Sequence, residues 1–137
     1  MKHSRIGECQ IITLPKFSFS MKGELAFANR ELIPFDIERV FYLYDIPEGE
    51  SRGGHAHIDQ HQFLICPIGT YDVLVDDGVR TNTFTLNRQN IGLHIPPGIW
   101  ATELNFAPGS ICLVFSSGVY LEVDYIRDYS AFKEYKK

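Results

Sequence analysis

Hydrophobic and polar residues alternate along most of the chain, and glycine, proline and Asp-Gly pairs interrupt the alternation at short intervals. Successive side chains of an extended strand point to opposite faces, so this alternation indicates strands with one buried face. We therefore expect strands over residues 39–45, 62–66, 71–76, 79–86, 91–95 and 110–115. Only the end of the chain, about residues 128–135, has the spacing of a short helix.

The segments between these runs predict how the strands connect. Asp77 and Gly78 separate two alternating runs, an arrangement typical of a tight β-hairpin. Residues 47–54 combine proline, serine and glycine and predict a loop. Many short strands without a long helical segment predict an all-β fold, either a sandwich or a barrel of the jelly-roll kind. The length of 137 residues suits one domain, which we expect to span residues 1–137.

Composition and charge exclude several classes of protein. Hydrophobic residues make up 45% of the chain and charged residues 22%, which is typical of a folded globule rather than a disordered chain. The net charge of -4 argues against a general nucleic-acid binder. No apolar stretch approaches the ~20 residues of a membrane helix, and the polar start, residues 1–5, lacks the apolar segment of a signal peptide. We expect a cytoplasmic protein with neither nucleic acid nor membrane as a partner.

The cysteines and the arginines carry different signals. The three cysteines are far apart and lie among apolar residues, which favours free thiols in the core over a disulfide or zinc site: Cys9, Cys66 and Cys112. Every lysine lies near one end of the chain, so the middle carries only arginine. Guanidinium groups suit bidentate binding of phosphate or carboxylate, although ordinary surface ion pairing stays open for each arginine.

His55 and His57 are the strongest candidates for chemistry. Residues two apart on a strand share a face, so both imidazoles should point to the same side, which can be the interior of a small barrel. Such a pair can bind a metal ion or transfer protons near neutral pH. A structural pair without chemistry is the alternative.

The spacing around this pair resembles the first motif of the cupin superfamily: Gly49, five residues, His55-x-His57, four residues, Gln62, six residues, Gly69. In metal cupins the position of Gln62 is normally glutamate. Ala101 stands where the second cupin motif has its last histidine. Two imidazoles alone would hold a divalent ion weakly, because catalytic sites ordinarily use three or four protein ligands. We therefore expect no metal and no other cofactor.

A longer series of segments is similar to the sugar 3,4-ketoisomerases that act on dTDP-4-keto-6-deoxy-D-glucose. The segments occur in the order 23–25, 33–35, 39–40, 51–57 with Gln62, 76–78, 86–88, 92–100 and 124–129. The resemblance covers roughly residues 20–132. Its most specific segments are Arg-Gly-Gly-His-Ala-His at 52–57 and Pro-Pro-Gly-Ile-Trp at 96–100.

This resemblance implies a metal-free cupin homodimer that moves the keto group of a nucleotide-linked sugar from C4 to C3. The product would be a precursor of 3-amino-3,6-dideoxy sugars of surface polysaccharides. The two catalytic histidines of that family fall on His55 and His57. We expect His55 to remove the C3 proton, giving an enediol, and His57 to handle the oxygen proton or deliver a proton to C4; the reverse assignment stays open.

Further residues in the matched segments are candidates for binding the substrate. The diphosphate needs positive charge, which we expect from Arg39, Arg52 and Arg88. Trp100 is a candidate for stacking on the base or sugar, with a packed lid as the alternative. Candidate donors to the developing oxyanion are Arg52, Tyr42, Tyr44 and Gln62, although strand packing is equally open for the tyrosines. We expect Glu103 to be solvated and His61 to lie at the surface.

Two other functions stay open at this stage. A metal-dependent cupin enzyme would retain stoichiometric metal despite Gln62 and Ala101. A non-catalytic module would bind the nucleotide sugar without converting it, and its histidine variants would have no phenotype in an activity assay.

Overall fold

Among residues 3–137, which the computed structural model describes, the chain forms twelve β-strands and one α-helix. Met1 and Lys2, part of the polar start discussed above, lie outside the described residues. The strands are β1 (Gln10–Thr13), β2 (Lys16–Phe19), β3 (Gly23–Ala26), β4 (Arg39–Leu43), β5 (Arg52–His57), β6 (Gln62–Ile68), β7 (Tyr71–Asp76), β8 (Thr81–Leu86), β9 (Ile91–Ile95), β10 (Trp100–Leu104), β11 (Ile111–Ser116) and β12 (Tyr125–Ile126). The helix is α1 (Tyr129–Lys136), and two short 3-10 helices are η1 (Ile6–Glu8) and η2 (Glu122–Asp124).

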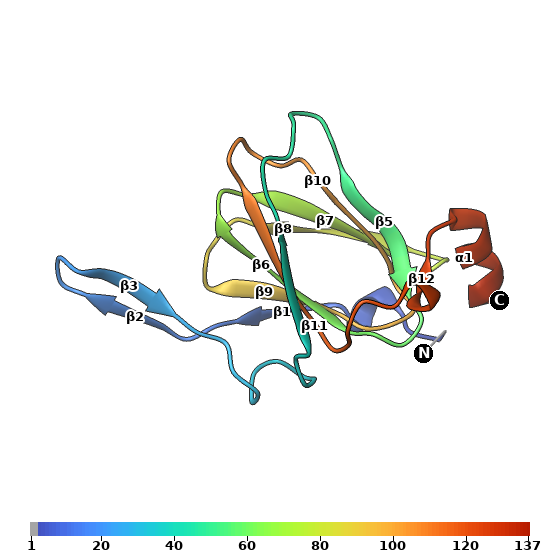
Figure 1. Ribbon diagram of the computed structural model, residues 1–137, viewed down its shortest axis with the longest axis horizontal. Helices are drawn as coiled ribbons and strands as arrows, with labels where there is room; N and C mark the ends of the chain where they lie inside the picture. The colour runs from blue at the N-terminus through green and yellow to red at the C-terminus, as the bar shows by residue number, and fades with distance from the viewer. Residues whose placement is uncertain (1–2) are drawn as a thin grey trace.

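Ten of the strands form two antiparallel sheets that face each other (Figure 1). The first sheet has the order β1-β9-β6-β11-β4, and the second has the order β12-β5-β10-β7-β8. Neighbours in each sheet come from distant parts of the sequence. The arrangement is a sandwich-like jelly roll, and the expectation of an all-β fold with a short C-terminal helix is confirmed.

Most expected strands are present with small shifts at their ends. The expected strands 71–76 and 91–95 agree with β7 and β9, and the Asp-Gly turn joins β7 to β8 as predicted. One expectation was wrong in part: residues 52–54 belong to β5 rather than to the preceding loop. The glycines at 53 and 54 have φ values of +82° and +76°, which only glycine adopts easily, so composition alone predicted a loop there.

The space between the sheets is filled by inward-facing side chains of β6, β7, β8, β9 and β11. The largest of them are aromatic or branched and fully buried, such as Tyr71, Leu64 and Leu93. All three cysteines are free and buried, as expected from their apolar surroundings. This core leaves one end of the sandwich to polar side chains, and those side chains form the candidate site.

A second hydrophobic cluster covers the outer face of the first sheet. Strand β6 therefore buries apolar side chains on both of its faces. Phe63 and Ile65 point outward from β6 and pack against Ile33 from the segment between β3 and β4. Gly92 on β9 makes room for Phe63, because a Cβ at Gly92 would lie 2.1 Å from Phe63 Cζ. The packing of Phe63 therefore requires glycine at position 92 of the neighbouring strand β9.

Helix α1 closes the end of the sandwich near the chain termini (Figure 1). Asp128 caps it by accepting a hydrogen bond from the Ala131 backbone N–H, and its buried Phe132 packs against Trp100. Lys136 extends this closure, since its Nζ donates to the carbonyls of Ser4 and Gly98 at 2.8 Å each. No helix within residues 3–137 is long and apolar enough to cross a membrane.

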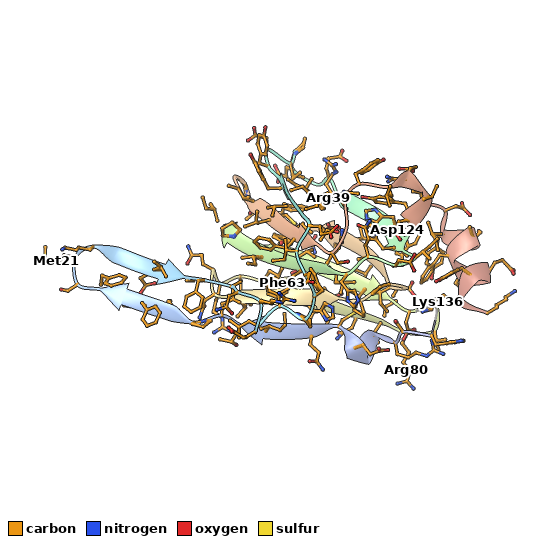
Figure 2. All side chains as sticks on the ribbon, turned by 60° about the horizontal axis from the view of Figure 1, so that its bottom comes forward. Met21, Arg39, Phe63, Arg80, Asp124 and Lys136 are labelled. Atoms are coloured by element: carbon orange, nitrogen blue, oxygen red, sulfur yellow. The ribbon has the colours of Figure 1, made fainter. Side chains whose placement is uncertain are left out.

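Strands β2 and β3 form a separate hairpin that extends away from both sheets (Figure 1). Met21 lies at its tip, as Figure 2 shows. Phe17 pairs with Leu25 across the hairpin, and Phe19 lies two residues further along the same face. Each of these three side chains is about half exposed, so residues 3–137 leave an apolar face of the hairpin only partly covered.

The contact between Gly92 and Phe63 gives a test of the fold. We expect Gly92→Ala to lower the free energy of unfolding by about 2 kcal/mol or more, because the new methyl group overlaps a buried ring. Urea unfolding measures the difference. Gly7→Ala is the matched control, since a Cβ at the exposed Gly7 meets nothing within 4 Å. Equal stability of both variants would contradict this packing.

Candidate active site

An open cavity of about 260 Å³ lies at the polar end of the sandwich, between the two sheets. Its lining includes the imidazole of His55, the amide of Gln62, the carboxyl of Glu103 and the phenol of Tyr125. The charged side chains of Arg39, Arg52 and Arg127 also border it. Behind it a small enclosed cavity of about 10 Å³, room for roughly one water molecule, is lined by both His55 and His57.

Local backbone geometry sets the two histidines side by side. β5 pairs with β10 through Ala101 opposite His55, and the register then shifts so that Thr102 lies opposite Gly53. This shift is a β-bulge, in which Gly54 has no paired residue on β10. The imidazole rings of His55 and His57 are 5.0 Å apart between centroids and meet edge to face.

His57 is held by a buried carboxylate. The Nδ1–H of His57 donates to Oδ2 of Asp124 at 2.8 Å, and the two side chains are about 95% buried. Asp124 is itself fixed, because its Oδ1 accepts the backbone N–H of Asp59 at 2.7 Å. A carboxylate at Nδ1 selects the tautomer whose Nε2 carries a lone pair, so His57 presents a proton acceptor to the small cavity.

Burial keeps both imidazoles neutral. It lowers the pKa of His55 to about 4, and the neighbouring His57 acts in the same direction. The pKa of His57 is also lowered by burial, although the hydrogen bond and charge of Asp124 oppose the shift. Near neutral pH both rings are therefore neutral imidazoles, each with one unprotonated nitrogen that can accept a proton.

The site contains polar atoms that the rest of the chain does not satisfy. Within the described part of the chain, Nδ1 of His55, Nε2 of His57 and Nε of Arg39 are buried without a hydrogen-bond partner. Buried polar groups are ordinarily paired, and unpaired ones cost about 1–3 kcal/mol each. Their concentration around one cavity is typical of a binding or catalytic site.

Arg39 is anchored beneath the cavity by a polar network. Its Nη2 donates to Oε1 of Gln60 at 3.2 Å and to Oγ of Ser116 at 3.4 Å. Its Nη1 lies 3.5 Å from the hydroxyl of Tyr125. Since the ring of Tyr125 also lies within 5 Å of both histidine rings, this network joins the arginine to the imidazole pair.

Arg127 covers the other side of Tyr125. Its guanidinium lies 4.1 Å from the centre of that ring and donates two hydrogen bonds to Glu122, at 2.6 and 2.9 Å. The arginine holds the pKa of Glu122 at about 2 through these bonds. This exposed ion pair fixes the position of the guanidinium at the mouth of the cavity, and the carboxylate of Glu122 offsets its charge.

The donor set does not fit the metal site of metal cupins. Gln62 offers a neutral amide, Ala101 offers a methyl group, and one nitrogen of His57 is committed to Asp124. Residues 3–137 contain no group of three or more His, Cys, Asp or Glu side chains arranged to hold a metal ion.

The structure brings some of the expected site residues to the cavity and separates others from it. His55, Arg39, Arg52 and Gln62 line the open cavity, and His57 lies directly behind it. The remaining expected residues lie elsewhere: Tyr42, Tyr44, Arg88 and Trp100.

Each separation has a simple geometric reason. Tyr42 and Tyr44 are 61% and 60% exposed, because on β4 the alternate residues Phe41 and Leu43 face the cavity instead. Trp100 packs edge to face on Tyr129 of α1. This contact agrees with the alternative of a packed side chain rather than with stacking on the base or sugar. Arg88 lines a different cavity at the base of the β2–β3 hairpin.

Two further sequence expectations were wrong. Glu103 is only 8% exposed and faces the cavity, because it lies two residues beyond the inward-facing Ala101 on β10. His61 is half-buried, and its Nδ1 lies 2.9 Å from Nε2 of His94 with the two rings stacked. This second histidine pair packs against Phe35.

Three residues that complete the site had no individual role predicted from the sequence: Asp124, Tyr125 and Arg127. They follow one another in the segment 124–129, which was quoted for its resemblance alone. Their spacing in the sequence alone does not predict a catalytic site. Tyr125 comes to lie opposite His57 only when β12 pairs with β5. The similarity of the segment to a known family was the one signal that could have found them.

Comparisons with known proteins agree with this geometry. Residues 7–137 match the family model described as FdtA: WxcM-like, C-terminal. The chain is 36% identical over 128 residues to a TDP-4-oxo-6-deoxy-alpha-D-glucose-3,4-oxoisomerase of Aneurinibacillus thermoaerophilus, covering 93% of this chain and 92% of that one.

Solved structures of similar proteins have the same fold. A 3,4-ketoisomerase from Helicobacter canadensis has a TM-score of 0.90 and 35% identity, covering 94% of this chain and 97% of its own. The sugar 3,4-ketoisomerase QdtA from Thermoanaerobacterium thermosaccharolyticum, in complex with TDP, has a TM-score of 0.90 and 30% identity, covering 95% of each chain.

The contact between His57 and Asp124 gives a second test. We expect Asp124→Asn to lower the pKa of His57 further, because the variant removes the negative charge that opposes burial. Side-chain nitrogen NMR of the histidines, followed as a function of pH, measures this pKa and the tautomer. Asp36→Asn, at an exposed carboxylate, is the control. An unchanged His57 titration in Asp124→Asn would refute the assigned hydrogen bond.

Proposed function

The chain belongs to the FdtA family of sugar 3,4-ketoisomerases, and we propose that it moves the keto group of dTDP-4-keto-6-deoxy-D-glucose from C4 to C3 by proton transfer through His55 and His57. One observation carries the histidine assignment. Two neutral imidazoles with unpaired buried nitrogens lie at a cavity bordered by three arginines.

The chemistry follows from the acidity of the hydrogen next to a ketone. Removing the proton from C3 gives an enolate, and the hydroxyl on C3 makes the neutral form an enediol shared between C3 and C4. Returning a proton to C4 completes the isomerisation. A base suited to this step is neutral at the working pH, and burial provides that state for both histidines.

His55 is proposed as the base that removes the C3 proton, because it borders the open cavity while His57 lies behind it. His57 is proposed as the second proton-transfer group. Its bond to Asp124 lets the buried ring accept a proton beside a compensating carboxylate rather than as an isolated cation. Asp124 therefore acts as a positioning residue.

The charged border of the cavity suits a nucleotide diphosphate. We propose that Arg52 and Arg127 bind the phosphates and that Arg39, with Tyr125, directs hydrogen bonds toward the sugar oxygens. Gln62 is retained as a donor from β6. This proposal leaves out Tyr42, Tyr44, Arg88 and Trp100, because their side chains lie away from the cavity of their own chain.

The setting of the reaction is part of the proposal. The 3-keto product is the substrate that an amine-transferring enzyme requires, which agrees with a place in the biosynthesis of 3-amino-3,6-dideoxy sugars. We propose that the protein works in the cytoplasm and without a metal or organic cofactor.

We also propose that the protein is a homodimer in which the β2–β3 hairpin packs on a second copy. An isolated two-stranded hairpin is marginally stable in water, yet this one presents Phe17, Phe19 and Leu25 on one face. A partner surface would cover that face. Since closed two-fold dimers are the commonest assemblies of soluble proteins, a second copy is the proposed partner.

The isomerase assignment is tested with dTDP-4-keto-6-deoxy-D-glucose in deuterium oxide. We expect a 3-keto product that carries deuterium at C4, detected by NMR and mass spectrometry. His55→Asn should lower kcat by about 1000-fold, because the base is lost. Absence of both product and hydrogen exchange with the wild-type protein would exclude the function.

Binding of dTDP separates the rival functions. A rise in the melting temperature of His55→Asn on adding dTDP would show that the variant is folded and binds ligand. If wild-type protein binds dTDP but neither exchanges hydrogen nor converts the sugar, the chain is a binding module. Stoichiometric metal whose removal abolishes turnover would instead show a metal-dependent enzyme.

The proposed dimer is tested by light scattering of the purified protein after size exclusion. We expect twice the mass of one chain for wild type and a shift toward monomer for Phe19→Asp, because a charge would enter the covered face. Lys22→Asn, in the exposed turn of the same hairpin, is the control. A monomeric wild-type protein would refute the dimer.

A further inference from the structure

The isomerisation moves two protons, and the histidines account for only one of them. At carbon, a proton is removed from C3 and a proton is delivered to C4. At oxygen, a proton leaves the hydroxyl on C3 and a proton reaches the oxygen on C4, which begins as a carbonyl and ends as a hydroxyl. A group beside both oxygens must therefore give one proton and take another, ending in its starting state.

Neither imidazole is prepared to give that proton when the reaction begins. The N–H of His57 donates to Asp124, and its other nitrogen carries a lone pair. His55 is neutral and is needed as the carbon base. The first proton to reach the C4 oxygen must come from another side chain.

Glu103 is the buried acid that the mechanism above leaves unused. It lies on β10, two residues beyond Ala101, and lines both the open cavity and the small cavity behind it. His55, Gln62 and Glu103 are the three residues common to the two linings. The carboxyl therefore lies at the junction where His55 meets the open space.

The backbone of β5 leaves room for this carboxyl. A Cβ at Gly53 would lie 2.1 Å from Oε2 of Glu103 and 3.0 Å from the carbonyl oxygen of Ala101. Any side chain at position 53 would displace the acid. The glycine two residues before His55 thus places Glu103 against the strand that carries the base.

Burial favours the protonated form of this carboxyl. Among the described residues it forms no ion pair, although Arg52 lies opposite it in the register of β5 and β10. Burial raises the pKa of Glu103 to about 7, and Arg52 opposes this shift. The titratable or charged groups that face it come from five strands or segments: Arg52, His55 and His57 from β5, Tyr71 from β7, Cys112 from β11, Arg39 from β4, and Tyr125 and Arg127 from the C-terminal segment.

We propose that Glu103 is a further catalytic residue, which relays the hydroxyl proton of the sugar from the oxygen on C3 to the oxygen on C4. As His55 takes the C3 proton, the O–H of the carboxyl gives its proton to the carbonyl oxygen, and the C3–C4 bond becomes the double bond of the enediol. The carboxylate then accepts the proton from the C3 hydroxyl while C4 receives the carbon proton. Glu103 ends protonated, so the step is balanced.

A carboxyl group suits this role better than the other hydroxyl in the cavity. Its two oxygens can give and take a proton on adjacent sugar oxygens, and its conjugate base is stable near neutral pH. Tyr125 would have to pass through a phenolate, which is a much stronger base than a carboxylate. Tyr125 is therefore the comparison residue in the test.

This inference rests on the proposed function, and kinetics of Glu103→Gln test it. Glutamine keeps the shape and can donate a hydrogen bond but cannot relay a proton. We expect kcat to fall by about 100-fold or more with KM within about threefold of wild type, because the lost step is proton transfer. The melting temperature and its rise with dTDP should stay close to wild type.

Two controls delimit this result. Glu134→Gln, at an exposed carboxylate on α1, should leave kcat unchanged. Tyr125→Phe should lower kcat less than Glu103→Gln does. A Glu103→Gln enzyme within about threefold of wild-type kcat would overturn the proposal, and so would a larger loss in Tyr125→Phe.

The pH profile gives a readout that a structural role would not change. Because the protonated carboxyl is the active form, kcat/KM of wild type should fall as the pH rises through about 7. Glu103→Gln should lose this alkaline limb. A limb that is unchanged in Glu103→Gln would refute the assignment.

Infrared difference spectra test the protonation state without reference to activity. Wild type minus Glu103→Gln in deuterium oxide at pH 6 should contain a protonated carboxyl band that disappears above pH 8. Absence of that band at pH 6 would overturn the proposal. Failure of the wild-type enzyme to isomerise the sugar would instead refute the proposed function, with the band still reporting on Glu103.

Discussion

The hydrogen bond between His57 and Asp124 is the interaction on which the rest of the site depends. It joins β5 to the segment after β11, and Asp124 reaches it because the backbone N–H of Asp59 holds the second carboxylate oxygen. The same contact sets Tyr125 opposite His57 in the sheet and orients the imidazole. One buried carboxylate thus controls the tautomer of a base and closes the wall of the cavity.

Burial acts in opposite directions on the acids and bases of this cavity. It lowers the pKa of His55 to about 4 and raises that of Glu103 to about 7, so His55 is neutral near pH 7 and a large fraction of Glu103 is protonated. A neutral base and a neutral acid beside the same substrate are the pair that enolisation needs. Asp124 differs from Glu103 in its contacts, because its two carboxyl oxygens accept hydrogen bonds from His57 and from the backbone N–H of Asp59.

The sequence predicted the fold and the histidine pair because both depend on local pattern. Alternation located β7 and β9, and the His-x-His spacing on one strand placed two imidazoles on one face. The sequence could not predict whether Tyr42 or Phe41 faces the cavity, because alternation defines two faces of a strand without showing which face is buried. Glu103 was missed for a related reason: a single carboxylate reads as exposed until the strand register buries it.

The position of the site along the chain has a consequence for synthesis. The strands of the hydrophobic core all precede Asp124, Tyr125 and Arg127 in the chain. During synthesis these strands therefore leave the ribosome before the segment that carries the three residues. Until that segment docks, His57 lacks its carboxylate and the cavity lacks a wall.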